Sequence, residues 1–521
     1  MLVVPAPSTH VHTTRILRSR ARLASERRTT ALVGTVFLAQ FAVLIAISRV
    51  AYERFTIGID FGIFAQAWSE IGRGQLNPDS TLSGFPYLSS HFELAMWPLG
   101  LLATVFQDPF VLLVLQAAAI ATSGFVVWCW VRALLRRDPL PAAWTTAISI
   151  GTVVLLLANP VAYATAAQDF HFWPIATCLL VLTAYDLWAG RTGRMWIWVV
   201  LALACGDVSG VYLLGLGLTG VLASRRTRGP GLALGAAGVG WVLLATATGN
   251  NMGSHIADGY AYLSDQPTLP EGIAGITMLT SGALKHPSRP LDLLVDRWDV
   301  IVAYLRAGGL VGAVTPWGLG VTLVAVLTAG LQGSAVFINQ PFQNFVITPF
   351  IAFGSVWLVV VVARRRTRAT TAAAVALGVL AIGSALSQAA HQLPDTTTHN
   401  GVGGLIPAAQ ADTYREVLDL TPDDAQVIAP LPSIGRFSAR PHIDPLNCPV
   451  GGSVLDVPVR TTTVVVVMDA ARPAPCLGPG GQDAIARALL TDLGAQVLAD
   501  RAGVTAYRFE VPAGRTRLTL G

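Results

Sequence analysis

The sequence predicts an all-α polytopic membrane domain followed by a small C-terminal α/β domain. Hydrophobic residues make up 53% of the 521 residues, charged residues only 12%, and the mean hydropathy is +0.56. Ordinary soluble domains carry about 25% charged residues. Apolar runs long enough to cross a bilayer recur from residue 31 to residue 388, and we assign this range to the membrane domain. From residue 389 onward, short apolar and polar segments alternate, as in a soluble domain.

Arginine clusters predict how the chain is oriented in the membrane. Basic residues gather beside apolar runs, as in cytoplasmic loops that follow the positive-inside rule. Residues 1–30 are therefore expected to form an Arg-rich cytoplasmic tail, and residues 389–521 an extracytoplasmic domain. The net charge of +5 is explained by these loops, so we expect no nucleic-acid partner. The other clusters are Arg132, Arg136 and Arg137; Arg225, Arg226 and Arg228; and Arg364, Arg365, Arg366 and Arg368.

The apolar runs predict about eleven membrane spans in a multi-pass protein of the plasma membrane. Residues 31–50 form an uncleaved first span, because no signal-peptide cleavage site follows them. Residues 92–106 are too short to cross and are expected to dip into the outer leaflet. Residues 195–224 are interrupted at Cys205–Gly210, which predicts two half-length helices. The remaining predicted spans are residues 110–131, 142–158, 173–189, 231–248, 300–314, 317–331, 344–363 and 370–386.

The first outer loop, residues 51–98, is much longer than a connection between two spans requires. Apolar residues recur at helical spacing from Ile59 to Ile71, which predicts an amphipathic helix lying on the membrane surface. The loop also carries Asp60 and His91, two residue types that perform acid–base chemistry. We interpret this loop as catalytic.

Two further ionisable sites lie at the ends of predicted spans. Asp169 and His171 precede the span that begins near Trp173, and Asp207 lies at the apex of the broken hairpin. Ionisable groups at membrane depth are costly and are functional candidates by default.

Each of these acids also has a structural interpretation. Asp60 could cap a helix, Asp169 and His171 could be ordinary loop residues, and Asp207 could bond to the broken backbone. Glu70 and Glu93 are expected to be solvated.

The last segment, residues 389–521, is expected to contain two helices, at residues 412–420 and 483–493. The expected strands are residues 426–429, 462–468, 496–498 and 506–511. Cys448 and Cys476 lie in this segment, and an extracytoplasmic location would permit a disulfide between them.

Several motifs resemble an uncharacterised family of bacterial and archaeal polytopic proteins, known only as predicted membrane proteins. The stretch IDFGIFAQAW resembles that family's DLGIFDQ motif, and HFELAMWPL and QDFHFWP resemble two later motifs. A further segment retains Asp207 but has Cys205 and Gly206 where the family has charged residues. The matching positions are Asp60, Gly62, Ile63, Phe64, Gln66, His91, Phe92, Asp169, Phe170 and His171, with a later resemblance in GRFSARPHI around Arg436 and Arg440.

That family in turn resembles the GT-C glycosyltransferases, which implies a GT-C-like membrane domain. The resemblance implies transfer of a sugar from a polyprenyl-phosphate donor to an extracytoplasmic envelope acceptor. It makes Asp60 the catalytic base, with Asp169, His171 and His91 binding the donor phosphate or a metal. A divalent cation, Mg²⁺ or Mn²⁺, would be bound by Asp60, Asp169 and His171. The residues expected to line the cavity are Gln66, Asp207, Arg436 and Arg440.

Two other functions remain open from the sequence. A transporter or flippase for a lipid or polar solute would explain the broken hairpin. A non-catalytic partner in envelope assembly would need only the C-terminal domain to bind another protein.

Overall fold

A computed structural model describes most of the chain. The described residues are 9–90, 92–248, 259–266, 273–334, 338–398, 406–447, 454–473, 477 and 480–520, with no account of the side chains of residues 9–25, 90, 273, 276 and 394–398. His91, Cys448 and Cys476 lie outside the described residues, so the role of His91 and the disulfide stay predictions.

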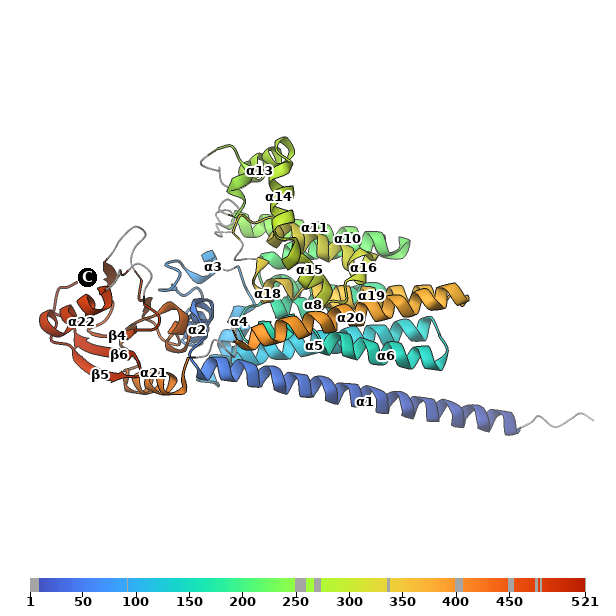
Figure 1. Ribbon diagram of the computed structural model, residues 1–521, viewed down its shortest axis with the longest axis horizontal. Helices are drawn as coiled ribbons and strands as arrows, with labels where there is room; N and C mark the ends of the chain where they lie inside the picture. Colours follow the sequence, from blue (N-terminus) through green and yellow to red (C-terminus); the bar gives the residue numbers. More distant parts are fainter. Residues whose placement is uncertain are drawn as a thin grey trace, which may run out of the picture.

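The membrane domain is a bundle of roughly parallel helices, and α1 (Thr9–Glu53) runs along its outer edge (Figure 1). Six described helices are long and apolar enough to cross a membrane. Four shorter apolar helices lie among them, so the predicted count of eleven spans stays a prediction. The long segments are Glu26–Glu53, Phe110–Arg137, Ala142–Ala166, Arg225–Ala247, Pro341–Ala363 and Arg368–Leu393, and the shorter ones are Trp173–Ala189, Thr192–Ala204, Val208–Ala223 and Pro316–Gly330.

The arginine-rich N-terminal segment is helical and continuous with the first span. α1 begins at Thr9 and has no boundary near residue 30. Arginine, the commonest residue of this segment, is a good helix former. The cytoplasmic location of the segment stays a prediction.

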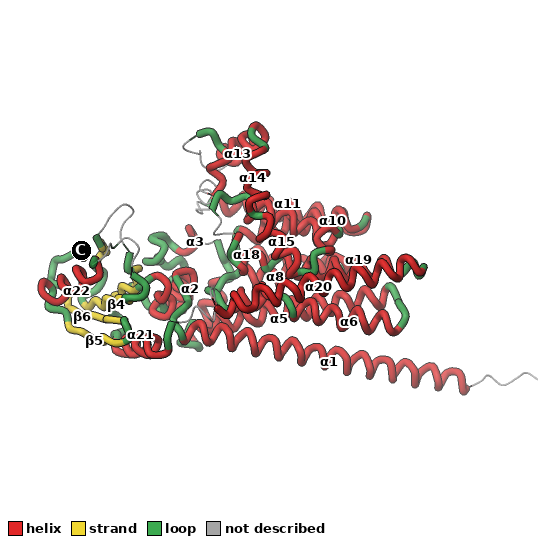
Figure 2. The backbone as a smooth tube through the Cα atoms, viewed as in Figure 1, coloured by secondary structure: helices red, strands yellow, loops and turns green. Residues whose placement is uncertain are grey.

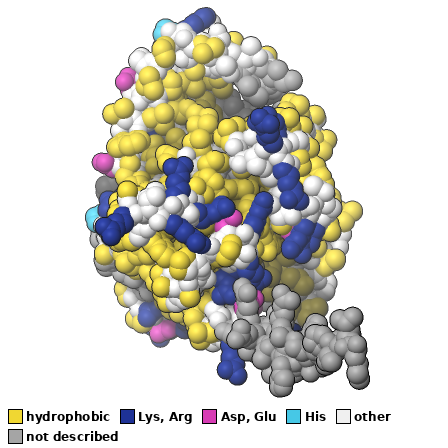
Figure 3. All heavy atoms as spheres, turned by 90° about the vertical axis from the view of Figure 1, so that its right-hand side faces the viewer, with side chains coloured by type: hydrophobic (Ala, Val, Ile, Leu, Met, Phe, Trp, Pro, Cys, Tyr) yellow, Lys and Arg dark blue, Asp and Glu magenta, His cyan; other side chains and the backbone are white. Residues whose placement is uncertain are grey.

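Arginines gather at one end of the bundle, away from the C-terminal domain (Figure 3). The sequence places them in the short turns that connect α5 (Phe110–Arg137) to α6 (Ala142–Leu157), α8 (Trp173–Ala189) to α9 (Thr192–Ala204), α10 (Val208–Ala223) to α11 (Arg225–Ala247), and α19 (Ile347–Ala363) to α20 (Arg368–Thr398). This distribution is typical of the cytoplasmic side of a membrane protein.

Polar caps define where several helices begin. Asn159 accepts a hydrogen bond from the backbone N–H of Val161 at the start of α7 (Pro160–Ala166). Thr315 does the same for Gly318 at the start of α16 (Pro316–Ala325). In both cases a proline takes the first helical position, where its missing N–H costs nothing.

Residues 92–106 contain no helix long enough to be a span, and their dip into the outer leaflet stays a prediction. They form α4 (Met96–Gly100) and the 3-10 helix η1 (Leu101–Thr104), which together are far shorter than a span. The region predicted as spans 300–314 and 317–331 is also broken. It forms α15 (Trp298–Ala307), the 3-10 helix η3 (Val311–Val314), α16 and the π-helical turn η4 (Val326–Gly330).

The predicted broken hairpin is present as α9 and α10, and α10 packs closely on α11 through glycines. A Cβ atom at Gly238 would lie 2.4 Å from the carbonyl oxygen of Gly210. Small residues at such a contact let two membrane helices approach closely.

α2 (Ile59–Gly72) is not the surface helix that its amphipathic pattern predicted. Gln66 and Glu70 on its polar side are buried together with the apolar residues. The helix lies between the bundle and the C-terminal domain (Figures 1 and 2). The C-terminal domain therefore covers the face of α2 that was expected to be exposed to water. One hydrophobic cluster joins Phe64 of α2 to Phe170 of the bundle and to Tyr414 and Val465 of the C-terminal domain.

The C-terminal domain is α/β, and both predicted helices and all four predicted strands are present. A five-stranded mixed sheet has the order β2-β1-β4-β6-β5, in which β1 is parallel to β2 and β4, and β6 is antiparallel to β4 and β5. The sequence did not predict β2, β3 and β7, which are short or lie at edges. The elements are α21 (Ala408–Leu420), β1 (Gln426–Ala429), the 3-10 helix η6 (Leu431–Phe437), β2 (Ile443–Pro445), β3 (Leu455–Pro458), β4 (Thr463–Asp469), α22 (Gly481–Asp492), β5 (Gln496–Arg501), β6 (Val504–Glu510) and β7 (Arg517–Leu520).

The glycine contact between α10 and α11 gives a matched test of the fold. We predict that Gly238→Leu lowers the melting temperature strongly, because the new side chain collides with the backbone of α10. Gly240→Leu, two residues along the same helix, meets nothing within 4 Å of its Cβ position and should be tolerated. Thermal unfolding of the purified variants in detergent measures the difference. Equal melting temperatures would contradict the packing of α10 on α11.

Candidate functional site

Asp60 and His171 meet at the end of the bundle that faces the C-terminal domain. The Nε2 atom of His171 lies 3.6 Å from the Oδ2 atom of Asp60. Asp60 comes from the first turn of α2, and His171 from the loop between α7 and α8. The Asp60 side chain is 51% exposed, whereas the His171 side chain is only 10% exposed. The structure thus brings together two predicted site residues that are far apart in sequence.

Aromatic contacts fix the imidazole of His171. Its ring stacks on Phe342 of α18 (Pro341–Asn344), with ring centroids 3.5 Å apart and planes 13° apart. The edge of Phe64 meets the same ring at 5.8 Å. These contacts leave Nε2 facing the carboxylate.

Asp169 caps α2 from outside that helix. Its Oδ1 atom accepts a hydrogen bond from the backbone N–H of Gly58 at 2.7 Å, and its Oδ2 atom accepts one from Phe61 at 3.3 Å. The first N–H groups of a helix have no partner within the helix, and a carboxylate satisfies both them and the helix dipole. The N-cap residue itself is Gly58, which has no side chain that could accept these hydrogen bonds. A Cβ atom there would lie 3.2 Å from Asp169, so glycine gives the carboxylate room.

Gln116 of α5 ties down the segment that carries Asp169 and His171. Its side-chain oxygen accepts from the backbone N–H of His171 at 2.8 Å. Its amide nitrogen donates to the carbonyl oxygens of Thr165, at 3.1 Å, and Asp169, at 3.3 Å. Sequence reasoning missed Gln116. The available signal was a glutamine within a predicted span, where polar side chains are costly and usually have partners.

Glu93 was expected to be solvated, and this prediction is wrong. Its side chain is buried and accepts a hydrogen bond from the hydroxyl of Tyr87 at 2.6 Å. Burial raises the pKa of Glu93 well above its ordinary range, and the negative charges of Asp207 and Asp60 raise it further. Burial therefore favours the protonated form of Glu93 over its carboxylate. No local pattern indicates this burial, because the loop that contains Glu93 folds back against the bundle, where the N–H of Ala95 donates to the carbonyl oxygen of Ala204.

Glu70 is buried as well, also contrary to expectation. It binds the side chains of Arg73 and Gln75 at the end of α2.

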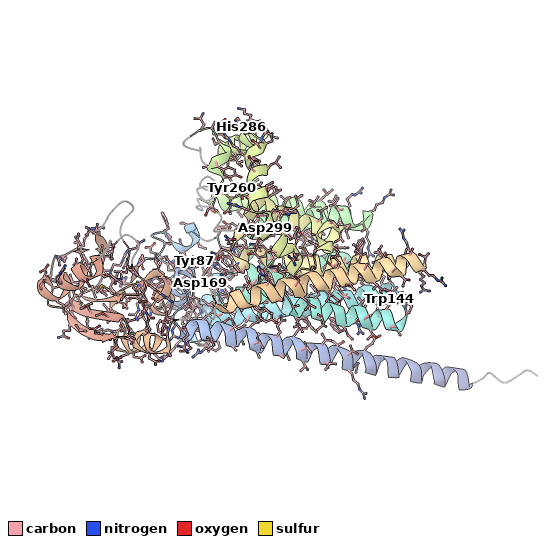
Figure 4. The ribbon with its side chains drawn as sticks, viewed as in Figure 1. Tyr87, Trp144, Asp169, Tyr260, His286 and Asp299 are labelled. Atoms are coloured by element: carbon pink, nitrogen blue, oxygen red, sulfur yellow. The ribbon has the colours of Figure 1, made fainter. Side chains whose placement is uncertain are left out.

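Asp207 lies close to Glu93 and caps α10. Its side chain accepts from the backbone N–H of Val208 at 2.7 Å, which is the structural interpretation offered from the sequence. It also lines a small pocket with Glu93, Trp173 and Tyr212. Figure 4 labels Tyr87 and Asp169, which lie where the bundle meets the outer loop.

The pKa values of Asp60 and Asp169 are both raised. For Asp60 the cause is the surrounding protein, which disfavours the charged form. For Asp169, burial and then the charge of Asp60 raise the pKa to about 7, although hydrogen bonds from backbone N–H groups oppose the rise. A carboxylate with a raised pKa is a better proton acceptor at neutral pH.

Gln66 and Arg440 hold the outer loop and the C-terminal domain in place. The buried amide of Gln66 donates to Pro441 at 2.9 Å and accepts from the backbone N–H of Thr81 at 3.1 Å. Arg440 donates to the carbonyl oxygens of Phe437, at 2.8 Å, and Pro422, at 3.0 Å. Burial lowers the pKa of Arg440 to about 10. These contacts assign both side chains a structural role at the domain junction.

Arg436 lies in the last turn of the 3-10 helix η6. Its guanidinium lies over the ring of Tyr52, 4.1 Å from the centroid, and 3.9 Å from Glu53. Among the described residues, its Nε atom has no hydrogen-bond partner. This Nε atom is buried, while the Arg436 side chain as a whole is 14% exposed.

Comparison with known proteins places the chain in a family. A model of the family named DUF2079, described as "Predicted membrane protein", matches residues 51–472. The chain belongs to this family. The match begins just before the outer loop and ends in the C-terminal domain, so it covers Asp60, Asp169, His171, Glu93 and Asp207.

No curated protein matches the chain. Among solved structures, the chain is similar to a crystal structure of ArnT from Cupriavidus metallidurans in the apo state. The two share 14% sequence identity and a TM-score of 0.44, and the similarity covers 91% of this chain and 97% of that chain.

A metal ion bound jointly by Asp60, Asp169 and His171 in this DUF2079 protein stays a prediction. Each carboxylate oxygen of Asp169 accepts one hydrogen bond, from Gly58 or from Phe61, and keeps a second lone pair. The described part of the chain contains no group of three His, Cys, Asp or Glu side chains placed to bind a metal.

The raised pKa of Glu93 gives a prediction about pH. A carboxyl whose pKa is raised by folding takes up a proton on folding. Its contribution to stability is therefore complete below its ordinary value of 4.5 and is lost as pH rises through the folded value. Glu93→Gln imitates the neutral acid and keeps an acceptor for Tyr87. We predict that the stability of the wild type falls relative to Glu93→Gln above pH 4.5, by up to about 1.4 kcal/mol per pH unit.

Thermal melts of both proteins from pH 4.5 to 8.5 measure this difference. Asp424→Asn, which changes an exposed carboxyl, is the control and should run parallel to the wild type. If the curves of Glu93→Gln and the wild type are also parallel, Glu93 is not protonated in the folded protein.

Proposed function

We propose that the protein is an integral-membrane glycosyltransferase that moves a sugar from a polyprenyl-phosphate donor to an extracytoplasmic envelope acceptor. One observation carries this proposal. The partly exposed carboxylate of Asp60 lies beside the rigid imidazole of His171, with both groups at the end of the bundle opposite the arginines. A partly exposed carboxylate backed by a buried imidazole at the rim of a membrane domain suits a reaction between a lipid-borne substrate and a polar one.

In this proposal Asp60 is the base. The hydroxyl oxygen of the acceptor forms a bond to the anomeric carbon of the sugar. The bond from that carbon to the phosphate oxygen breaks, and its electron pair leaves with the polyprenyl phosphate. The hydroxyl proton passes to the carboxylate of Asp60, whose raised pKa favours proton uptake.

His171 and Asp169 have different roles in this step. His171 is close enough to orient the carboxylate of Asp60 and, when protonated, to add a positive charge beside the departing phosphate. Asp169 acts as a positioning residue, because it holds the first turn of α2 on which Asp60 lies.

The donor phosphate would lie toward Arg436. Four carboxyl groups surround the junction, namely Asp60, Glu93, Asp169 and Asp207, so a phosphate needs a cation nearby. The Nε atom of Arg436 has no hydrogen-bond partner among the described residues. The backbone N–H of the neighbouring Gly435 donates to the carbonyl oxygen of Ile57, so this segment is held next to the start of α2. With the arginine-rich turns in the cytoplasm, this junction lies outside the cell.

A transporter is the second candidate, favoured by the break between α9 and α10. The backbone at this break is buried among side chains, with Trp241 donating to the carbonyl oxygen of Gly206 at 3.0 Å. Broken helices at membrane depth are common in transporters. Solute uptake without any covalent product would support this function and contradict transfer.

Asp60→Asn provides the main test. We predict that it lowers sugar transfer at least about 100-fold, the range for loss of a general base, because the amide cannot accept the proton. Asp79→Asn, an exposed acid in the same outer loop, should keep the activity of the wild type.

The assay uses protein in nanodiscs with radiolabelled undecaprenyl-phosphate hexoses and pentoses and an envelope extract. It measures label transferred to the extract and undecaprenyl phosphate released. Melting temperatures of both variants confirm folding. Transfer by folded Asp60→Asn at the wild-type rate would remove Asp60 from the reaction. Failure of the wild type to turn over any donor would contradict the function itself.

A further inference from the structure

A second feature of the bundle lies away from the Asp60–His171 pair. An apolar groove with a cavity of about 450 Å³ runs between α6, α19 and α20. This volume is within the range of about 300–1,000 Å³ for ligand pockets. Its walls are almost entirely hydrophobic, including Trp144, Ile148, Leu155, Val356, Val379 and Leu386.

The groove opens on the outside of the bundle. Val379 and Leu386 of α20 line it and are 66% and 47% exposed, so their side chains face the surroundings of the helices. In a membrane those surroundings are lipid chains. Trp144, at one end of the groove, lies toward the arginine-rich end of the bundle (Figure 4).

Two glycines create the open space. Gly378 and Gly383 both line the groove, and a Cβ atom at either position would meet nothing within 4 Å. The space is therefore left by missing side chains and is not closed by a neighbouring helix.

A cation lies at the other end of the groove. Arg306, in the last turn of α15, donates a hydrogen bond from its Nη2 atom to the hydroxyl of Ser387 at 2.8 Å. Ser387 follows Leu386, the last residue of α20 that lines the groove. Within the described residues Arg306 has no ion pair, so its charge is not neutralised by a carboxylate.

We propose that this groove binds one anionic glycerophospholipid of the bilayer. A hydrocarbon chain of the lipid lies between α6, α19 and α20, and its phosphate accepts hydrogen bonds from Arg306. A guanidinium binds a phosphate through two parallel N–H groups, which explains selection of an anionic headgroup. The hydrocarbon chain gains van der Waals packing against the three helices, while the phosphate stays at the outer boundary of the membrane.

The lipid site is separate from the proposed reaction. Helix α7 packs against α20, which lines the groove, and against α18, which carries Phe342. His171 packs on Phe342 and Phe64 and lies beside Asp60, and none of these residues lines the groove. The bound lipid is thus a structural ligand, and its presence does not depend on glycosyl transfer.

Titration of the delipidated full-length protein with phosphatidylglycerol tests the proposal, with binding followed by native mass spectrometry. We expect one tightly bound phosphatidylglycerol and at least about tenfold weaker binding of phosphatidylcholine of the same chain length. Arg306→Gln should weaken phosphatidylglycerol about tenfold and abolish the preference for it, since a charge-assisted hydrogen bond is lost. Gly378→Leu should weaken both lipids, because the new side chain fills the groove.

Two matched variants control for folding and for charge. Gly240→Leu places the same side chain on α11, where nothing lies within 4 Å, and Arg515→Gln removes an exposed arginine of the C-terminal domain. Both should bind phosphatidylglycerol like the wild type. Equal affinity of the wild type for the two lipids, or no effect of Arg306→Gln, overturns the proposal. Displacement of phosphatidylglycerol by equimolar undecaprenyl phosphate also overturns it, because the groove would then be a donor site.

Discussion

The capping of α2 by Asp169 is the contact on which the rest of the site depends. The outer loop follows α1, whereas Asp169 belongs to the loop between α7 and α8. By accepting from Gly58 and Phe61, the carboxylate joins these two parts of the chain and fixes where α2 begins. Asp60 lies between these two residues, so the same contact places its carboxylate beside His171. A loss of this cap would leave the buried N–H groups of α2 without partners, which is costly.

Neighbouring acids add to the effect of burial on the pKa values of Glu93 and Asp169. Burial raises the pKa of Glu93 most directly, and the charges of Asp60 and Asp207 add to that effect. Asp169 is raised by burial and by Asp60, while the N–H groups of α2 partly offset the rise. In both Glu93 and Asp60 the pKa shift favours the neutral form, and Glu93 is the more deeply buried of the two.

The sequence predicted elements with strong local signals and missed contacts that depend on tertiary structure. The apolar runs predicted the long helices, and the interruption at Cys205–Gly210 predicted the break between α9 and α10. The strands of the C-terminal sheet were predicted where β-branched residues cluster, as in Thr463–Asp469. α2 was predicted as a helix, but its burial was not, because the C-terminal domain that covers it comes more than 300 residues later. Glu93 and Gln116 were missed for the same reason, since neither has a local signal for its partners.

Hydrogen exchange at the start of α2 tests the central claim most directly. Exchange followed by mass spectrometry compares the wild type with Asp169→Ala in the peptide that contains Gly58, Asp60 and Phe61. We expect the amides of this peptide to exchange slowly in the wild type and much faster in the variant, with the C-terminal sheet unchanged. Equal exchange at Gly58–Phe61 in the two proteins would contradict the role of Asp169 in holding Asp60 against His171.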